Sequence, residues 1–262
     1  MADIGIADAG LDLGRVVRDT FAVGRRRAAQ LFGVTLALYL LPLIATGYYA
    51  QGMIAAAGRN DPATRLGLFA SPVYWGLLLV STLLGSFAYA FQLKIAIGDL
   101  EGDPPNLDEA VLAGLKRLLP VLAASLLLGV GIGLGMVFLI VPGIILAMTW
   151  SVTLPSIVDR GGVFAGFSHS RDLTRGNRWR IFGLALVFGI VAVAIQAVLS
   201  VAVGGGTAAT RMGAGSSVFG LVVISIYSWI ISVLTTVGLA SLYAQLWELK
   251  TGGGEGAAQV FA

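Results

Sequence analysis

One histidine and its two flanking serines come closest, among the residue types of this sequence, to a catalytic set. His169 lies between Ser168 and Ser170. Serine–histidine catalysis needs a third group that orients the histidine, and the hydrolase form also needs a glycine-flanked serine turn that this sequence lacks. A solvated loop residue is the other interpretation of His169. With no cysteine and no second histidine, the sequence predicts no catalytic residue, no metal site and no cofactor.

Four glycines that alternate with other residues form a second pattern. They lie inside an apolar run and no ribose-binding acid follows them, which argues against a nucleotide-binding loop. Their spacing instead contains two overlapping G-x-x-x-G pairs, Gly129 with Gly133 and Gly131 with Gly135. Such pairs let another helix backbone approach closely, within one chain or between two chains. The pattern therefore predicts close helix packing at this face.

Charged residues avoid the middle of the apolar segments, and Lys94 lies near the end of one of them. This distribution argues against ion-coupled transport, because such transporters use titratable groups inside the membrane. Uncharged polar side chains are present and could line a polar path or form hydrogen bonds between helices. They are Ser81, Thr82, Ser125, Thr149, Ser151, Gln196, Ser225 and Thr235.

The elements that must carry these residues follow from the composition. Of the 262 residues, 57% are hydrophobic and only 12% are charged, whereas a soluble domain carries about a quarter charged residues. The apolar runs approach or exceed the roughly 20 residues that a helix needs to cross a bilayer. We therefore predict an all-α polytopic membrane protein with six transmembrane helices arranged as three hairpins. The crossings are expected near residues 29–51, 72–97, 118–140, 142–158, 180–203 and 217–246.

The fourth crossing is the shortest and follows the Val141-Pro142-Gly143 break directly. A tight hairpin with the third crossing is expected there, and a single bent helix is the alternative. Three segments result: an N-terminal segment at 1–28, a transmembrane domain at 29–247, and a flexible tail at 248–262.

Lysine and arginine counts predict the orientation of the chain. Fourteen of the 17 basic residues fall on one side of the predicted crossings, and only Arg59, Arg65 and Arg211 fall on the other. Because positive residues are retained in the cytoplasm, both termini are expected to be cytoplasmic. The formal charge of +3 is interpreted as an interaction with anionic lipid headgroups on that side. Nucleic-acid binding is not predicted, since no basic stripe interleaved with aromatics is present.

Each pair of crossings is preceded by a short stretch with helical periodicity and basic residues at its membrane end. These stretches are residues 11–27, 107–117 and 163–180. Amphipathic helices of this kind lie in the headgroup region, so three interfacial cytoplasmic helices are expected.

The residues from Val141 to Gly183 carry a family resemblance. They contain Val141-Pro142-Gly143, then Leu154-Pro155-Ser156, then Ser170-Arg171-Asp172-Leu173-Thr174-Arg175-Gly176-Asn177-Arg178-Trp179-Arg180. This pattern resembles the membrane domain attached to some bacterial glycerophosphoryl diester phosphodiesterases and the related YciC-like inner-membrane proteins. The resemblance implies a six-helix domain of the bacterial inner membrane. Phosphodiesterase activity is not implied, because in those proteins it belongs to a separate barrel that uses histidines and carboxylates around a divalent cation.

Several motif positions are expected to have structural or lipid-contact roles. Pro142-Gly143 should make the external hairpin, Gly176 should end the third interfacial helix, and Trp179 should fix the fifth crossing at the headgroups. The full set of candidates is Arg25, Arg26, Arg27, Gly129, Gly133, Pro142, Gly143, Pro155, Arg171, Arg175, Gly176, Arg178, Trp179 and Arg180.

These features predict a non-enzymatic membrane scaffold that self-associates and organises or curves the bilayer. Its expected partners are membrane lipids and further copies of the chain. A transporter or channel for a small or lipidic solute is the first alternative, and a membrane-bound enzyme is the second.

Overall fold

The computed structural model describes residues 10–57, 67, 69–203 and 218–260, and the regular structure within these ranges is helical throughout. Six helical segments are long and apolar enough to cross a membrane, as expected of a multi-pass membrane protein. Each predicted crossing coincides with one of them. The spans are Ala29–Met53, Pro72–Glu101, Leu107–Phe138, Ile140–Arg160, Arg178–Ala202 and Val218–Gly252.

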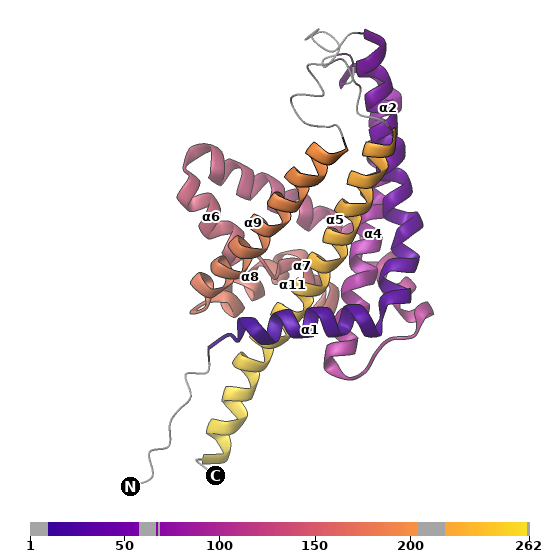
Figure 1. Cartoon of the computed structure of the whole chain (residues 1–262). Coiled ribbons are helices and arrows are strands. Elements are labelled where there is room, and N and C mark those ends of the chain that lie inside the picture. The colour runs from indigo at the N-terminus through magenta and orange to yellow at the C-terminus, as the bar shows by residue number, and fades with distance from the viewer. Residues whose placement is uncertain (1–9, 58–66, 68, 204–217, 261–262) are drawn as a thin grey trace.

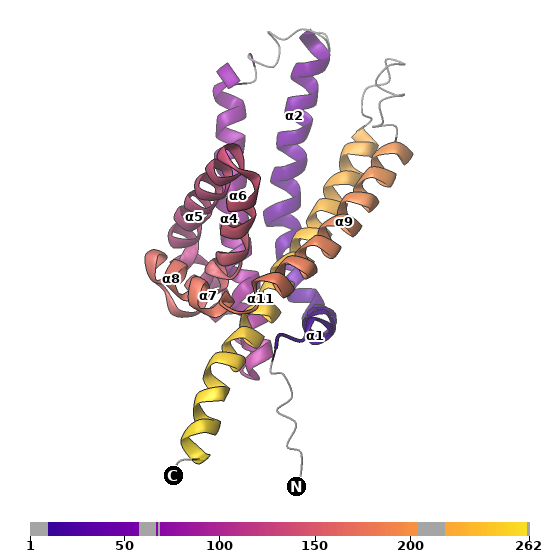
Figure 2. The same ribbon diagram turned by 90° about the vertical axis from the view of Figure 1, so that its left-hand side faces the viewer.

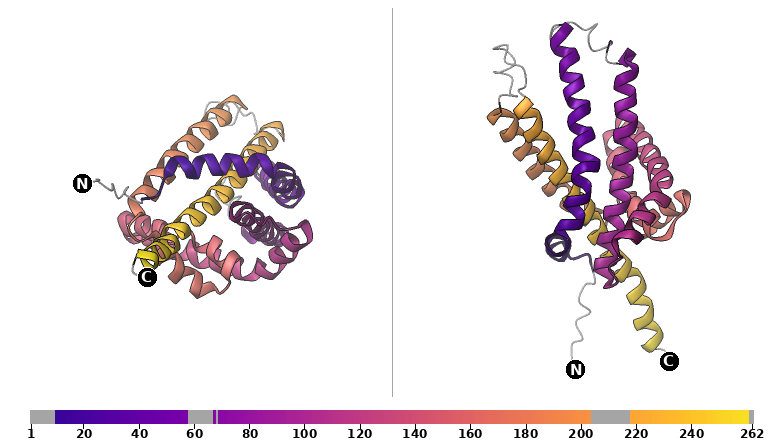
Figure 3. Two further views of the ribbon diagram at one scale, coloured as in Figure 1. Left: turned by 90° about the horizontal axis from the view of Figure 1, so that it is seen from below. Right: turned by 90° about the vertical axis from the view of Figure 1, so that its right-hand side faces the viewer.

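Helix α1 (Leu13–Arg26) lies across one end of the bundle, nearly perpendicular to the long helices (Figure 1). The Asp12 side chain caps it by accepting a hydrogen bond from the Arg15 N–H at 3.1 Å. Seen from below, α1 crosses over α11 (Val218–Val260) (Figure 3). We call this end of the molecule the α1 end.

Two π-helical turns, η1 (Ala29–Gly33) and η2 (Leu36–Leu40), connect α1 to α2 (Leu41–Ala57). The chain then returns along α4 (Pro72–Glu101), which Ser71 caps through its side chain. Gly102, with a φ of 82°, ends α4 in the left-handed conformation that favours glycine.

Helix α5 (Leu107–Phe138) contains the second stretch that was expected to be a separate interfacial helix. Residues 107–117 instead form the first turns of α5. A capping box starts the helix at Asn106, whose N–H donates to Glu109 at 3.1 Å. Gly114 packs against Phe87 of α4, since a Cβ at Gly114 would lie 2.9 Å from that ring. This stretch is therefore not a separate helix, and it packs against α4 as the start of α5.

The chain reverses between α5 and α6 (Ile140–Thr149), which lie side by side (Figure 2). The reversal occurs at Leu139, whose φ of −157° and ψ of 123° interrupt the helix. The expectation that Pro142-Gly143 makes this turn is therefore wrong. Pro142 lies in the first turn of α6, where a backbone N–H has no helical partner to lose. Gly143 packs against Gly135 of α5. Neither Pro142 nor Gly143 therefore forms the bend.

The fourth span is a broken helix. Helix α6 ends at Thr149, a turn follows, and α7 (Thr153–Arg160) continues in its place. Gly161 and Gly162, with φ values of 82° and 80°, then lead into α8 (Val163–Thr174). Gly176, with a φ of 93°, follows the end of α8 as expected, and α9 (Arg178–Ala202) begins two residues later.

Helix α11 continues to Val260, through most of the residues expected to form a flexible tail. No proline interrupts this segment, so the helix of the sixth span can propagate beyond the bundle. Its far end and α1 lie at the same end of the molecule (Figure 1).

Candidate functional site

Two consecutive arginines anchor the end of α1 to α4. Arg26 donates to Asp99 from Nε at 3.0 Å and from Nη2 at 2.7 Å, and Arg27 Nε donates to the second Asp99 oxygen at 2.8 Å. The Asp99 side chain is only 6% exposed. A carboxylate at this depth needs such partners, because burying an unpaired charge is strongly unfavourable. This contact fixes where α1 joins the bundle.

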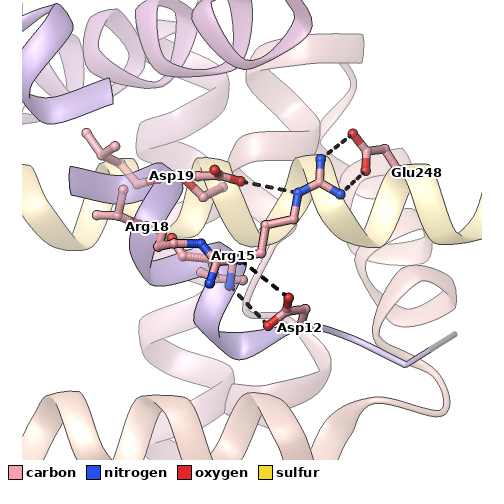
Figure 4. Close-up of polar contacts among 9 residues, drawn as sticks. Asp12, Arg15, Arg18, Asp19 and Glu248 are labelled. Atoms are coloured by element: carbon pink, nitrogen blue, oxygen red, sulfur yellow. Dashed lines mark hydrogen bonds and ion pairs between the residues drawn. The ribbon is translucent and has the colours of Figure 1, made fainter. Parts of the chain in front are cut away.

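The other end of α1 contacts α11 (Figure 4) and also the α8–α9 loop and the start of α9. Arg15 donates to both carboxylate oxygens of Glu248, at 2.8 and 3.1 Å, and its Nε lies 3.6 Å from Asp19. The hydrogen bond and charge of Glu248 raise the pKa of Arg15 above its ordinary value. Leu11 N–H donates to the Asn177 side chain at 3.3 Å, and Arg180 donates to the Leu11 carbonyl. Side chains from α4, α11, the α8–α9 loop and α9 therefore hold α1 across the end of the bundle.

A second polar cluster joins α7 and α8 to α11. Tyr243 donates a hydrogen bond to Asp159 at 2.7 Å. The Arg160 guanidinium stacks on the Trp247 ring, 3.6 Å from its centroid. His169 meets the same tryptophan edge-on at 5.6 Å. The only histidine is therefore a packing partner of an aromatic ring, and within the described ranges no group of three or more His, Asp or Glu residues is placed to hold a metal ion.

The break in the fourth span exposes a backbone carbonyl that α8 satisfies. The Thr149 carbonyl accepts from the Ser170 hydroxyl at 2.9 Å and from the Thr174 hydroxyl at 3.3 Å. By contrast, the hydroxyls of Ser151, Thr153 and Ser156 are buried and have no hydrogen-bond partner among the described residues. The break therefore contains both satisfied and unsatisfied polar groups within the membrane-spanning part of the chain.

An apolar cavity of about 260 Å³ lies beneath α1, between α9 and α11. Val16, Val17, Thr20 and Phe21 form its α1 wall. Side chains from Ile181 to Phe188 of α9 and from Leu234 to Leu242 of α11 form the other two walls. The hydroxyl-bearing Ser151 also lines it, and none of the lining residues is charged. Such a surface binds hydrocarbon better than it binds a polar solute.

Apart from Gly129 and Gly133, the predicted site residues fall into three groups along the chain. Arg26 and Arg27 share Asp99, whereas Arg25 is exposed beside them. Gly143 packs at the α5–α6 turn with Pro142, and Pro155 is buried in α7. The last group lies between α8 and the start of α9, where Arg171, Arg175, Gly176, Trp179 and Arg180 are exposed and Arg178 is partly buried.

The two overlapping glycine pairs separate in the structure. Gly131 and Gly135 pack within the chain, against Trp150 and Gly143 respectively. Gly129 and Gly133 are exposed, and a Cβ on either would meet no described residue within 4 Å. The structure thus assigns only one of the two pairs to packing inside this molecule.

Sequence reasoning missed the acidic and aromatic partners, namely Asp99, Asp159, Tyr243, Trp247 and Glu248. Asp99 lies more than 70 residues from the arginines that it pairs with. An isolated carboxylate at a helix end carries no signal of its partner. The cavity was missed too, because its walls come from helices that are distant in the sequence.

Comparison with protein-family models, with curated proteins and with solved structures finds no match to this chain. The resemblance to the phosphodiesterase-associated membrane domain therefore stays a prediction. The fold itself defines the class, a multi-pass α-helical membrane protein with six apolar spans.

Proposed function

We propose that this protein is a non-enzymatic scaffold of a bacterial inner membrane, with its α1 end in the cytoplasm, and that it adds area to the cytoplasmic leaflet. The arginines gathered at the α1 end support this orientation, since positively charged residues are retained on the cytoplasmic side. Because α1 lies across one end of the bundle (Figure 1), it would add area to one leaflet only. A helix lying in the headgroup plane displaces lipid in that leaflet alone.

The exposed apolar face of α1, which also forms one wall of the cavity, is the observation that carries the proposal. Val17 and Phe21 are 43% and 58% exposed, and Arg18 and Arg25 are exposed on the adjoining surface. Exposed apolar side chains beside arginines suit the boundary between hydrocarbon and phosphates, where the apolar groups insert and the guanidinium groups stay with the headgroups. Phe164 of α8 and Trp179 of α9, each 80% exposed, support the same boundary.

Self-association is the second part of the proposal. The open Gly129 and Gly133 face of α5 is flanked by exposed Val130 and Leu134. A surface without side-chain bulk allows a second copy to approach closely in a bilayer, where dispersion contacts drive helix association. Two copies related by symmetry would place two α1 helices in the same leaflet and increase its area further.

Reconstitution into vesicles tests the scaffold proposal. At high protein density we expect vesicles of reduced diameter or tubules, measured by cryo-electron microscopy. The double variant Val17→Ser with Phe21→Ser should abolish this change, because α1 loses its inserted side chains. The matched control, Val198→Ser with Val201→Ser, changes two exposed residues of α9 and should retain it. Unchanged vesicle shape with the unaltered protein would contradict the proposal.

Movement of a lipidic solute is a second candidate function, and the broken fourth span favours it. Unwound backbone within a membrane is tolerated where it is buried in protein or lines a cavity, as in many transporters. The partnerless Ser151 hydroxyl at this break lines the apolar cavity. A fluorescent-lipid scrambling assay with the same vesicles tests this function. Lipid exchange between leaflets no faster than in protein-free vesicles would remove the candidate.

A further inference from the structure

We infer that the cavity beneath α1 binds one acyl chain of a membrane glycerophospholipid whose anionic headgroup lies at Arg178. This inference goes beyond the scaffold proposal, because it concerns a single retained lipid and not the shape of the bilayer. It rests on the cavity, on a partly buried cation at the start of α9, and on the geometry that relates the two.

The lining of the cavity selects hydrocarbon. Its walls are aliphatic and aromatic apart from three hydroxyls, and no carboxylate or amide lines it. An apolar protein cavity of about 150 Å³ can hold one benzene molecule, so 260 Å³ accommodates on the order of ten carbon atoms. That amount corresponds to part of one acyl chain and is too small for a transmembrane helix.

The position of the cavity along α9 matches the path of a lipid. The α9 wall extends from Ile181 to Phe188, and Arg178 lies three residues before it. With a rise of 1.5 Å per residue, the cavity extends from about 5 to about 15 Å beyond Arg178. Arg178, Ile181 and Ala185 have the i, i+3, i+7 spacing that places them along one face of the helix. A chain that follows this face of α9 from Arg178 therefore reaches the cavity wall at Ile181 and Ala185.

The polar groups at the start of α9, next to the cavity wall, favour an anion. Arg178 Nε is buried and has no hydrogen-bond partner among the described residues. The first turn of α9 contains no acidic residue, and its N-cap residue, Asn177, makes no capping bond because its side-chain oxygen accepts from Leu11 N–H. The N-terminus of a helix carries a partial positive charge, and here no N-cap side chain occupies it. A phosphate here would satisfy both the arginine and the helix end.

Lipid retention by the full chain provides the test. The protein is reconstituted with phosphatidylcholine and phosphatidylglycerol at four to one, extracted in mild detergent, and analysed by native mass spectrometry. We expect one phosphatidylglycerol per chain, although that lipid is the minority component. The measured mass also separates a phospholipid from a free fatty acid or a detergent molecule.

Two variants fill the cavity from opposite walls. Ala185→Phe and Gly238→Leu should each reduce the retained lipid at least five-fold. A Cβ at Gly238 would lie 3.6 Å from the Thr20 hydroxyl, an ordinary contact, so the backbone can accept the larger side chain. Ala194→Leu, on an exposed part of α9 outside the cavity, is the matched control and should retain the lipid. Thermal unfolding midpoints establish that each variant is folded.

A third variant separates headgroup recognition from chain binding. Arg178→Gln should leave a lipid in place but shift its identity toward phosphatidylcholine, the majority component. Arg175→Gln, which removes an exposed charge from the same loop, should not. Equal retention by the filled and unaltered proteins, retention of a fatty acid only, or a lipid identity that follows the bulk composition would each overturn the inference. None of these results depends on vesicle shape, so failure here is distinct from failure of the scaffold proposal.

Discussion

The two ends of the bundle are held together by different means. At the α1 end, all residues of α4 from Ala88 to Gly98 except Tyr89 and Lys94 are buried, and α11 has most of its buried residues between Val233 and Leu246. Toward the opposite end the first half of α4 has no buried residue, and α9 has only Ile181 buried, close to its start. Away from the α1 end, α2 and α9 diverge (Figure 2).

The polar contacts follow the same division. Arginine–carboxylate pairs and the Tyr243 contact with Asp159 lie at the α1 end. Farther along the bundle, the polar contacts between helices of the described residues are neutral hydrogen bonds, such as Thr46 with Ser81 at 3.0 Å. Helices in hydrocarbon satisfy their own backbone groups, so they need few side-chain bonds to persist. We infer that contacts at the α1 end determine how the helices are arranged. At the opposite end, the helices are stable in hydrocarbon without such contacts.

The largest effect is expected at Asp99. Asp99→Asn should lower the free energy of unfolding by about 2–4 kcal/mol, because Arg26 and Arg27 lose the buried carboxylate that they share. Unfolding in mixed micelles, followed by circular dichroism, measures the change. Asp103→Asn removes an exposed carboxylate from the adjacent loop and should change stability by less than about 0.5 kcal/mol. Equal losses for the two variants would contradict the role assigned to the α1 end.

The next effect distinguishes the close α5–α6 contact, where Gly143 packs on Gly135, from the open face of Gly129 and Gly133. A Cβ at Gly143 would lie 2.6 Å from the Met136 backbone nitrogen, so Gly143→Ala should separate α5 from α6 and lower the unfolding free energy by about 1–3 kcal/mol. Gly133→Ala meets nothing within 4 Å and should leave the monomer as stable or slightly more stable. The same unfolding assay in dilute micelles compares them. A destabilising Gly133→Ala would show that this face is packed even in the monomer.

How much the sequence could reveal differs between the two ends. The spans followed from hydropathy, because crossing hydrocarbon imposes a length and composition that each segment carries by itself. The contacts of the α1 end involve residues far apart in the chain, such as Arg15 with Glu248, and no local pattern encodes that pairing. Gly176 was predictable, since a helix end is a local feature. The Pro142-Gly143 turn was not, because these residues are equally compatible with a reversal and with the first turn of the next helix.

A smaller effect is expected from the hydroxyl of Tyr243. Tyr243→Phe removes the hydrogen bond to Asp159 and should lower the unfolding free energy by about 1–2 kcal/mol. Tyr48→Phe, at an exposed tyrosine of α2, is the matched control and should be neutral. Protection of α7 amides in hydrogen exchange should fall in the first variant only. If exchange increases instead throughout α11, the cluster stabilises the sixth span more than the α7–α8 layer.

The smallest effect is expected from the exposed pair of Arg15 and Glu248. A double-mutant cycle with Arg15→Ala and Glu248→Ala should give a coupling of about 0.2–1 kcal/mol, because both side chains are solvated. High salt should reduce it. Because the pKa of Arg15 is raised, Arg15 stays charged up to a pH above the ordinary pKa of arginine. Its stabilising interaction with Glu248 is therefore lost only above that pH. The coupling should therefore stay constant between about pH 6 and 9. A coupling that disappears within that window would mean that another titrating group, and not the arginine, determines how α1 contacts α11.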